Sequence, residues 1–310
     1  MIVALAGGVG GAKLSQGIAR AIDPHSLTVI VNTADDFDLW GLRICPDLDT
    51  VMYTLAGISD PVQGWGVAGD TTRTLQAIAA FGEAPWFRLG DRDVATHVLR
   101  TARLRAGEDL GSVTHGLAQA LGIRSHILPM SNDPVSTIVH TDDGSLEFQE
   151  YFVARRQADD VIGLSYLGVE DAIAHPATIR ALRDAETVVV CPSNPFVSVG
   201  PILAVPGMKR ALDQSRAFKL AVSPIIGGNA VKGPAAKMMA TLGHDVSALG
   251  IARLYAGLVD ALVIDHADAA LAAPIADLGL RVLVTQSVMG GPADRERFAR
   301  EMLAWVDDIR

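Results

Sequence analysis

The chain opens with "MIVALAGGVGGAKLSQGIARAIDPHSLTVIVNTADD", residues 1–36, and this stretch indicates the fold. Residues 1–7 are apolar up to a terminal glycine, which is typical of a buried strand. Residues 12–22 repeat apolar side chains at helical spacing, and residues 26–36 form a second apolar run that ends in two carboxylates. A strand, a glycine turn, a helix and a strand make a right-handed βαβ unit, so the sequence predicts a parallel sheet.

The turn after the first predicted strand holds four glycines and a lysine. It matches neither the Walker pattern, because Ala12 precedes Lys13 and Leu14 follows it, nor the dinucleotide fingerprint counted from Gly8. A strand-to-helix turn that binds nothing is the alternative, but four glycines exceed what a tight turn requires. Glycine amides and a helix N-terminus favour phosphate oxygens. We therefore expect a phosphate-bearing ligand at Gly7, Gly8, Gly10, Gly11 and Lys13.

Composition narrows the class of protein. With 310 residues, 49% hydrophobic and 20% charged, the chain is globular and long enough for one large α/β domain or two small ones. A net charge of −9 argues against a nucleic-acid binder. Cys45 and Cys191 lack metal-site spacing, which fits a reducing cytosol. No signal-peptide pattern and no apolar run long enough for a membrane span are found, so we expect a cytoplasmic protein without membrane contact.

Later segments extend the same pattern. Four apolar runs predict further strands of the sheet, in residues 186–203, 217–228, 261–268 and 280–286. An Asp-Asp-Gly turn between alternating apolar residues predicts a β-hairpin within residues 136–156. The expected fold is α/β, a Rossmann-like parallel sheet with helices on both faces. We expect a single domain over residues 1–310, with a helical and β-hairpin insertion or cap at roughly 62–180.

A cluster of carboxylates follows the second predicted strand: Asp35, Asp36, Asp38, Asp47 and Asp49. Oxygen ligands of this kind suit Mg²⁺, and a carboxylate can also receive a hydroxyl proton. The alternative is a set of solvated loop carboxylates, with Asp49 as a helix N-cap. For any single aspartate that alternative is preferred, but the cluster beside a predicted phosphate loop favours a functional role.

Three further segments carry polar candidates. Arg88 and Arg92 suit phosphate or carboxylate recognition, and surface ion pairs are an equal alternative, while we interpret His97 as structural. Polar residues at the ends of two later strands suit a nucleotide base or phosphate, with a proline-rich connector as the alternative; they are Ser193, Asn194, Gly227, Gly228 and Lys232. No nucleophile-elbow pattern occurs.

Taken in order, these stretches resemble the 2-phospho-L-lactate transferase family, which makes the deazaflavin coenzyme F-420. The resemblance covers nearly the whole chain and rests on blocks such as "GGVGGAKL", "NTADDF", "CPDLDTVMYTLAG", "LGDRDVATHVLRT", "FQEYFV", "PSNPFVSVGPIL" and "KGPAAKMM". One departure is Asn132-Asp133, where the family pattern has two adjacent aspartates; this weakens any metal role for residue 132.

The resemblance implies a Mg²⁺-dependent transferase. The donor is a guanosine diphosphate whose outer phosphate carries a small acid, giving phospholactate, phosphoenolpyruvate or phosphoglycerate transfer. The acceptor is the ribityl hydroxyl of 7,8-didemethyl-8-hydroxy-5-deazariboflavin, and GMP leaves. Pocket shape decides which acid is used, so the sequence leaves the acid open. A homodimer is also expected.

The resemblance also implies roles for the candidate residues. The glycine turn with Lys13 holds the diphosphate, and the loops of Ser193 and Gly227 contact the guanosine side. Asp47 and Asp49 bind Mg²⁺ or orient the hydroxyl, with Asp49 the first choice for contact with the deazaflavin. Arg88 or Arg92 meets the acceptor or the carboxylate of the transferred group. Further candidates at the sheet edge are Asn32 and Asp35.

Three alternatives stay open at this point. A nicotinamide-dependent dehydrogenase is disfavoured by the broken dinucleotide fingerprint. A non-catalytic nucleotide-binding regulatory protein of the same fold has no need for the carboxylate cluster. Gluconeogenesis-factor-like proteins share the fold, but the "CPDLDTVMYTLAG" and "LGDRD" blocks lean away from them.

Overall fold

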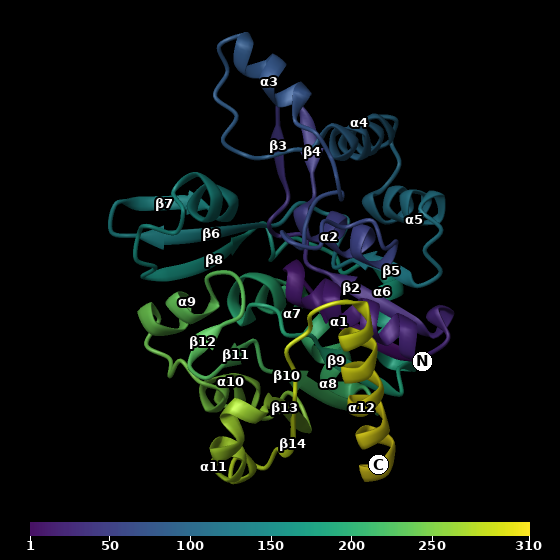
Figure 1. Ribbon diagram of the computed structural model, residues 1–310, viewed down its shortest axis with the longest axis vertical. Helices are drawn as coiled ribbons and strands as arrows, with labels where there is room; N and C mark the ends of the chain where they lie inside the picture. Colours follow the sequence, from purple (N-terminus) through teal and green to yellow (C-terminus); the bar gives the residue numbers. More distant parts are fainter.

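The computed structural model describes all 310 residues and confirms the predicted α/β class. Seven parallel strands form the central sheet, in the order β14-β13-β10-β9-β1-β2-β5 (Figure 1). They are β1 (Ile2–Ala6), β2 (Leu27–Val31), β5 (His126–Pro129), β9 (Thr187–Val190), β10 (Phe218–Val222), β13 (Ala261–Asp265) and β14 (Arg281–Thr285). The interior strand β1 pairs in parallel with β2 on one side and β9 on the other, and its Ile2 lies opposite Leu27 and Thr187.

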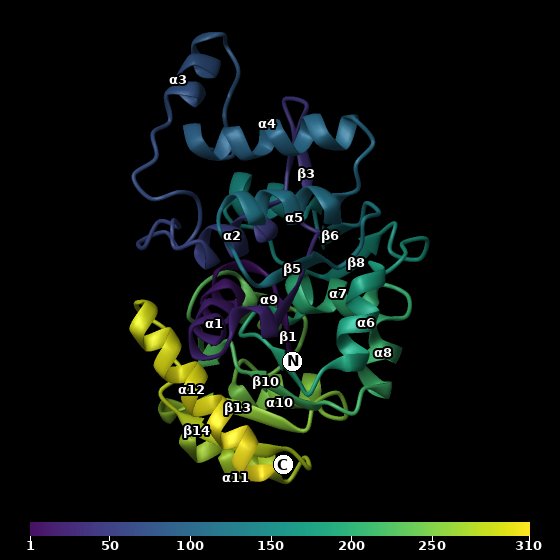
Figure 2. The ribbon, with the colours of Figure 1, turned by 90° about the vertical axis from the view of Figure 1, so that its right-hand side faces the viewer.

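Helices cover both faces of this sheet, as the sequence predicts (Figure 2). Side chains alternate along a strand, so Val3 and Leu5 of β1 enter one hydrophobic cluster while Ala4 and Ala6 enter the other. The cluster of Ala4 packs against α1 (Gly8–Ala21), α2 (Pro46–Leu55), α5 (Leu110–Ala120) and α12 (Pro292–Ile309). The cluster of Val3 packs against α6 (Pro176–Asp184), α7 (Gly200–Ala204), α8 (Met208–Gln214), α10 (Ala248–Tyr255) and α11 (Ala272–Ala276). None of the helices combines the length and hydropathy needed to cross a lipid bilayer.

The strand order reverses between β1 and β9. From β1 the chain runs outward through β2 to β5, and it then returns to β9 and runs the other way through β10 to β14. In open α/β sheets such a reversal leaves a crevice at the carboxyl ends of the strands, where ligands bind. Here the glycine turn after β1 and the Pro192 loop after β9 open at that point.

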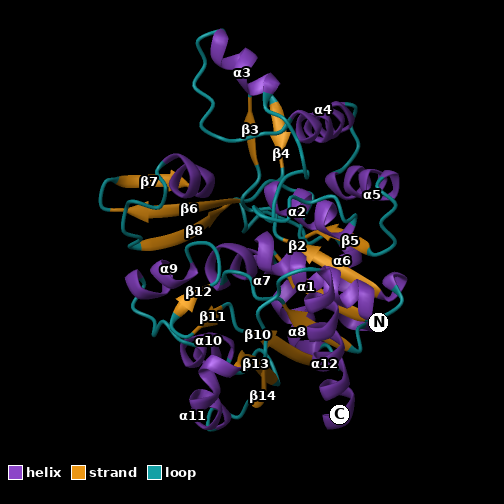
Figure 3. Cartoon of the chain, in the orientation of Figure 1, coloured by secondary structure: helices purple, strands orange, loops and turns teal.

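Smaller elements surround the carboxyl edge of the sheet (Figure 3). An antiparallel hairpin, β3 (Phe37–Leu39) and β4 (Leu42–Ile44), projects beside α3 (Arg73–Ala80) and α4 (Asp91–Arg105). A three-stranded antiparallel sheet contains β6 (Ser136–Thr141), β7 (Gly144–Glu147) and β8 (Gly163–Leu167). The remaining elements are the pair β11 (Ile225–Ile226) and β12 (Asn229–Ala230), helix α9 (Ala235–Thr241), two 3-10 helices (Pro24–Ser26 and His266–Leu271) and two π-helices (Glu150–Ala154 and Pro195–Val199).

The structure refines the predicted insertion at roughly 62–180. This range is not one added unit, because β5 lies inside it and joins the edge of the central sheet. The predicted hairpin within 136–156 is present as β6 and β7, but its strand pairing ends at Glu147. Residues 150–154 instead form a π-helix, in which Tyr151 packs with Val197 in a separate hydrophobic cluster. Tertiary packing therefore overrides the local alternation there.

Close packing of α1 on α12 gives a stability prediction. A Cβ added at Gly17 would lie 2.3 Å from the carbonyl oxygen of Arg295, so Gly17→Ala forces the two helices apart. We expect the clash to cost about 2–3 kcal/mol, of which the helix propensity of alanine offsets about 1 kcal/mol. Urea denaturation should show a net loss of stability. Gly116→Ala is the control, because its Cβ meets only the mobile end of Arg103; equal behaviour of the two variants would contradict the prediction.

Candidate active site

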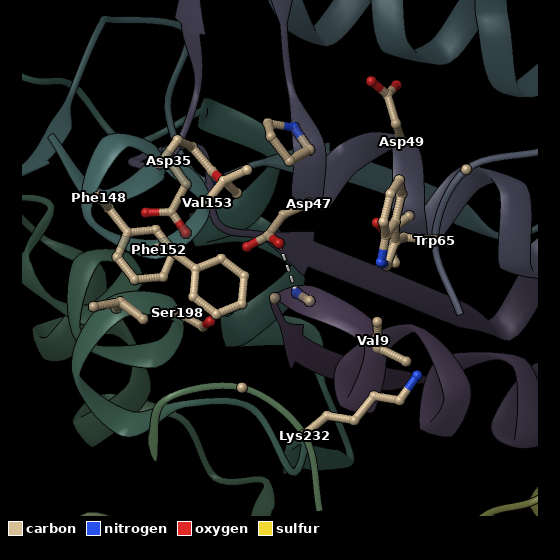
Figure 4. A pocket seen from close by; sticks show the side chains of 18 of the residues that line it. Val9, Asp35, Asp47, Asp49, Trp65, Phe148, Phe152, Val153, Ser198 and Lys232 are labelled. Carbon is tan, nitrogen blue, oxygen red and sulfur yellow. Dashed lines mark hydrogen bonds between the residues drawn. The ribbon is translucent and has the colours of Figure 1, made fainter. Parts of the chain in front are cut away.

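A cavity of about 510 Å³ lies where the strand order reverses. Its walls come from segments far apart in the chain: the glycine turn, the first turn of α2, the 192–198 loop and the 232–234 loop. Figure 4 shows the glycine turn, Asp47 and Asp49 beside this one cavity. The predicted convergence of the glycine turn with the Asp47–Asp49 segment is therefore present.

The glycine turn is fitted closely against neighbouring backbone. Gly8 has a positive φ of 61°, which lets α1 begin directly after β1. A Cβ at Gly10 would lie 2.3 Å from the carbonyl oxygen of Pro192, and one at Gly11 would lie 2.7 Å from Ser193 Oγ. Gly7, Gly8 and Gly10 line the cavity, whereas Gly11 serves the packing of α1 against the loop after β9. Of the first amides of α1, which have no helical partner, that of Gly8 donates to Asp47, and the amides that follow it in the turn are available to an anion.

Asn32 holds a pair of buried carboxylates at the sheet edge. Its Nδ2 lies 3.1 Å from Asp35 Oδ2 and 2.9 Å from Asp47 Oδ2, so it donates toward both. Asp47 Oδ1 accepts a hydrogen bond from the amide of Gly8 at 2.7 Å, which joins α2 to the glycine turn. Asp35 Oδ1 is buried without a hydrogen-bond partner. Asn32 itself does not line the cavity, and it acts by orienting the two aspartates.

Burial penalises the charge on this pair. It raises the pKa of Asp47 to about 6, although hydrogen bonds from Asn32 and Gly8 oppose the shift. It also raises the pKa of Asp35 well above its ordinary value, and the neighbouring Asp47 charge adds to the effect. Two like charges with an unpartnered oxygen are stabilised by a cation, and carboxylate oxygens are the ligands that Mg²⁺ prefers. Asp35 and Asp47 therefore fit a divalent metal.

Asp49 has a different environment, although it lies only two residues from Asp47. Helix α2 begins at Pro46, so Asp49 lies in its first turn and is not the N-cap that the sequence suggested. The fully buried Arg100 faces both carboxylate oxygens: Nη1 donates to Oδ2 at 3.0 Å and Nη2 pairs with Oδ1. His97 Nδ1 lies 3.6 Å from Oδ2. The guanidinium already provides the cation here, so the geometry favours Asp35 over Asp49 as the partner of Asp47 at a metal.

Comparison with known proteins shows the family of the chain. The family model of the 2-phospho-L-lactate transferase CofD matches residues 2–277. The chain is 40% identical over 315 residues to a phosphoenolpyruvate transferase of Streptomyces griseus, covering 100% of this chain and 99% of that protein. It is 37% identical over 308 residues to a 2-phospho-L-lactate transferase of Methanosarcina acetivorans, covering 99% and 100%.

The chain belongs to the 2-phospho-L-lactate transferase family. It is thus a transferase, as the sequence predicted. A solved structure from Bacillus halodurans, a member of the UPF0052 family, has the same fold, with a TM-score of 0.62 at 17% identity over 97% of this chain and 98% of that one.

Not every residue predicted from the family blocks lies in the cavity. Arg88 lines it, and its Nη1 donates to Gln63 Oε1 at 3.1 Å. Arg92 lies outside it, with Nη1 3.4 Å from the carbonyl oxygen of Ala68. The position of Arg92 outside the cavity therefore agrees with the alternative, a surface residue, and not with ligand recognition.

The nucleotide-side candidates divide in the same way. Ser193 and Asn194 line the cavity, and Ser193 Oγ bonds both the amide and the carbonyl of Gly7. Gly227 and Gly228 lie outside it: their φ values of 56° and 76° form the turn between β11 and β12, and the amide of Gly227 faces Asp268. The cavity therefore does not support the predicted contact of Gly227 and Gly228 with guanosine.

Lys13 lies in a smaller recess next to the cavity. This recess, of about 70 Å³, shares Val9, Gly10 and Lys232 with the main cavity. The Nζ of Lys13 donates to the carbonyl oxygen of Met289 at 2.9 Å. Burial, with the neighbouring charge of Arg295, lowers the pKa of Lys13. Lys13 is thus beside the glycine turn but turned away from the Asp35–Asp47 pair.

Several cavity residues were absent from the predicted site. Tyr53, Asp93 and His97 line the cavity wall beside Asp49. The Tyr53 hydroxyl lies 2.7 Å from Asp93 Oδ1, and the buried Nε2 of His97 has no hydrogen-bond partner. The available signal was helical spacing, because Asp93 and His97 share one face of α4, as Asp49 and Tyr53 share one face of α2. His97, interpreted as structural, therefore faces the cavity.

An aromatic pair was missed as well. Phe148 and Phe152 stack with ring centroids 5.4 Å apart and an interplanar angle of 7°. Both line the cavity, and Phe148 packs with Val197, whose carbonyl oxygen accepts from Asn32. An apolar wall therefore stands directly beside the carboxylate pair (Figure 4).

Removing Arg100 tests the buried ion pair. Arg100→Met leaves the Asp49 carboxylate buried without its cation, so we expect the free energy of unfolding to fall by about 3–5 kcal/mol. Arg103→Met is the control: Arg103 lies on the same helix and pairs with Glu108 at the surface, so its loss should leave stability nearly unchanged. Urea unfolding of both variants measures the difference, and a similar small effect of the two would show that the pair is not stabilising.

The raised pKa of Asp35 predicts a pH-dependent stability difference. At a pH above the pKa of Asp35 in the folded protein, its buried charge destabilises the folded state. This penalty disappears as the pH falls, because the carboxyl is then protonated in both the folded and the unfolded state. Without added metal, the free energy of unfolding of Asp35→Asn should exceed that of the wild type by about 1–3 kcal/mol at about pH 8, and the difference should disappear toward about pH 4. Urea unfolding across pH measures it. The largely exposed Asp38→Asn is the control, with a small and constant difference; a constant gap for Asp35→Asn would refute the prediction.

Proposed function

We propose that this protein transfers a phospho-acid group from its guanosine diphosphate adduct to the ribityl hydroxyl of 7,8-didemethyl-8-hydroxy-5-deazariboflavin, with release of GMP. The observation that carries the proposal is the hydrogen bond between the Gly8 amide and Asp47 Oδ1. It joins a phosphate-type glycine turn to a carboxylate pair suited to Mg²⁺ in one cavity. The names of the Streptomyces and Methanosarcina relatives support a phospho-acid donor.

The donor would lie along the glycine turn. The free amides at the start of α1 donate to the diphosphate, and Ser193 and Asn194 lie toward the nucleoside. Asp35 and Asp47 would hold Mg²⁺, which when bound neutralises charge on the two phosphates. Phe148 and Phe152 provide an apolar surface for the small acid beside the outer phosphate.

The acceptor would lie at the α2 and α4 end of the cavity. Arg100 holds the Asp49 carboxylate in place, and Asp49 accepts a hydrogen bond from the attacking hydroxyl. Tyr53 and His97 offer further polar contacts beside it. The ribityl oxygen then forms a bond to the outer phosphorus and gives its proton to Asp49, while the bond from that phosphorus to the bridging oxygen breaks and GMP leaves with the bonding electrons. Such transfers depend mainly on positioning and charge stabilisation.

The proposal includes each of the three acids. Relatives named for phosphoenolpyruvate and for 2-phospho-L-lactate are similarly identical to this chain, at 40% and 37%. Identity therefore does not distinguish the acids, which differ only in a small methyl, methylene or hydroxymethyl group. The homodimer and the cytoplasmic location expected from the sequence stay predictions.

Product analysis tests the proposed reaction. The protein is incubated with the deazaflavin acceptor, Mg²⁺ and each of the three guanylylated acids, and the product and GMP are identified by mass. We expect one acid to give a phosphodiester product with equimolar GMP. Asp47→Asn should lower kcat by about a hundredfold or more, because it loses charge at the diphosphate.

Arg92→Ala is the control variant for this assay, because Arg92 lies outside the cavity and its loss should leave the rate nearly unchanged. Nucleotide binding without GMP release would support the regulatory alternative instead. Wild-type turnover by Asp47→Asn would overturn the assigned role of the carboxylate.

A further inference from the structure

A closed loop over the cavity, residues 59–67, is held to both of its walls; we call it the strap. Its ends are joined by an antiparallel bridge between Ser59 and Val67. Inside it, the Asp60 carboxylate accepts hydrogen bonds from two backbone amides of the loop, both at 2.9 Å. The strap is therefore a preformed unit with its own internal hydrogen bonds.

Gln63 of the strap binds two cations from opposite walls. Its carbonyl oxygen accepts a hydrogen bond from Lys232 Nζ at 2.7 Å, and its side-chain Oε1 accepts one from Arg88 Nη1 at 3.1 Å. Lys232 precedes α9 and Arg88 precedes α4, so one residue spans the cavity between them. Lys232 Nζ also lies 3.4 Å from the carbonyl oxygen of Val62.

These two side chains are the only lysine or arginine side chains that line the main cavity. An anion that recruits a cationic side chain of this cavity must therefore draw on the same groups that hold the strap. Phosphate and carboxylate oxygens are charged acceptors, and they bind ammonium and guanidinium groups more strongly than the neutral amide oxygens of Gln63 do.

We propose that binding of the anionic donor takes Lys232 and Arg88 from Gln63 and so releases the strap from the cavity. The inference rests on the proposed function, which supplies a donor with a diphosphate and a carboxylate. Trp65 of the strap lines the same cavity as Asp49, beside which the acceptor is placed (Figure 4). Donor binding therefore opens the acceptor end, and the donor binds before the acceptor.

The closed position depends on glycine at residue 64. Gly64 has a positive φ of 79°, and a Cβ there would lie 2.6 Å from Val9 Cγ1 and 3.4 Å from Lys232 Nζ. Val9 belongs to the glycine turn, so the strap rests directly on the predicted diphosphate site. A methyl group at residue 64 would push the strap off that site and leave Lys232 and Arg88 chemically intact.

GDP is the probe for strap release, with binding measured by isothermal titration calorimetry and tryptophan emission recorded in parallel. Trp65 lines the cavity, so its emission should change as GDP saturates the protein, and Trp65→Phe should remove that change. GDP binding without a Trp65-dependent change in emission would overturn the proposed release of the strap but would leave the proposed function intact. Absence of GDP binding with Mg²⁺ would overturn both.

Gly64→Ala and Gly69→Ala make a matched pair of variants. Both residues have a positive φ, of 79° and 64°, but a Cβ at Gly69 meets nothing within 4 Å. Gly64→Ala should show released-strap emission without ligand and bind GDP about threefold to tenfold more tightly, because GDP no longer competes with Gln63. Gly69→Ala should behave like the wild type. Equal GDP affinity in the two variants would overturn the proposal.

Lys232→Met removes the hydrogen bond from Lys232 to the carbonyl oxygen of Gln63 and so tests the attachment of the strap directly. It should also show released-strap emission without GDP, but it should bind GDP about tenfold more weakly because a donor-binding cation is lost. Opposite changes in affinity with the same change in emission separate strap release from general loosening of the fold. Wild-type emission from Lys232→Met before GDP is added would contradict the proposal.

Discussion

The Asp47 carboxylate organises the site more than any other group. One of its oxygens accepts from the Gly8 amide and the other from Asn32, so it ties the first turn of α2 to the turn after β1 and to the end of β2. The turn after β1 and the end of β2 lie together because β1 and β2 are neighbours in the sheet. The same contacts place the buried Asp47 carboxylate next to Asp35. Burying the two acidic groups together lowers the stability of the folded protein. A cost of this kind is typical of functional sites.

Charge is distributed so that anions and cations have separate places in the cavity. Asp49 is neutralised inside the protein by Arg100, whereas Asp35 and Asp47 have no cationic side chain within ion-pair distance. The cavity cations, Lys232 and Arg88, are held by neutral oxygens of one loop residue. The pair of carboxylates is thus matched to a metal, and the two cations are matched to phosphate and carboxylate groups.

The comparison with the Bacillus halodurans structure separates fold from chemistry. At 17% identity the sheet and its helices superpose over 97% of this chain, so the architecture tolerates extensive replacement of side chains. The residues that carry the proposed reaction lie on turns and loops at the carboxyl edge of the sheet. Family membership is therefore what connects this scaffold to transfer chemistry, because one fold supports many functions.

Local properties of the chain were sufficient to predict six of the seven sheet strands, whereas β5 was missed inside the range taken as an insertion. Apolar strands, helical spacing and the glycine turn after β1 are features of neighbouring residues. Asn32 and Asp35 follow the end of β2, and Asp47 was predicted from the cluster of carboxylates. Two local interpretations were wrong. Residues 150–154 form a π-helix for a tertiary reason, because Tyr151 packs against distant side chains. The N-cap alternative for Asp49 failed for a local reason, because α2 starts at Pro46 and proline is favoured at the first position of a helix.

The sequence alone thus determined the class of sheet, the position of its functional edge and the identity of most acidic groups there. Only the tertiary structure decided which charges meet: Arg100 pairs with Asp49 from 51 residues away, and Lys232 reaches Gln63 across 169 residues. The local sequence does not indicate such partners, because the residues around an arginine or lysine do not show which distant acceptor it will meet. Their roles follow from the three-dimensional path of the chain, which brings α4 and the loop before α9 to opposite walls of one cavity.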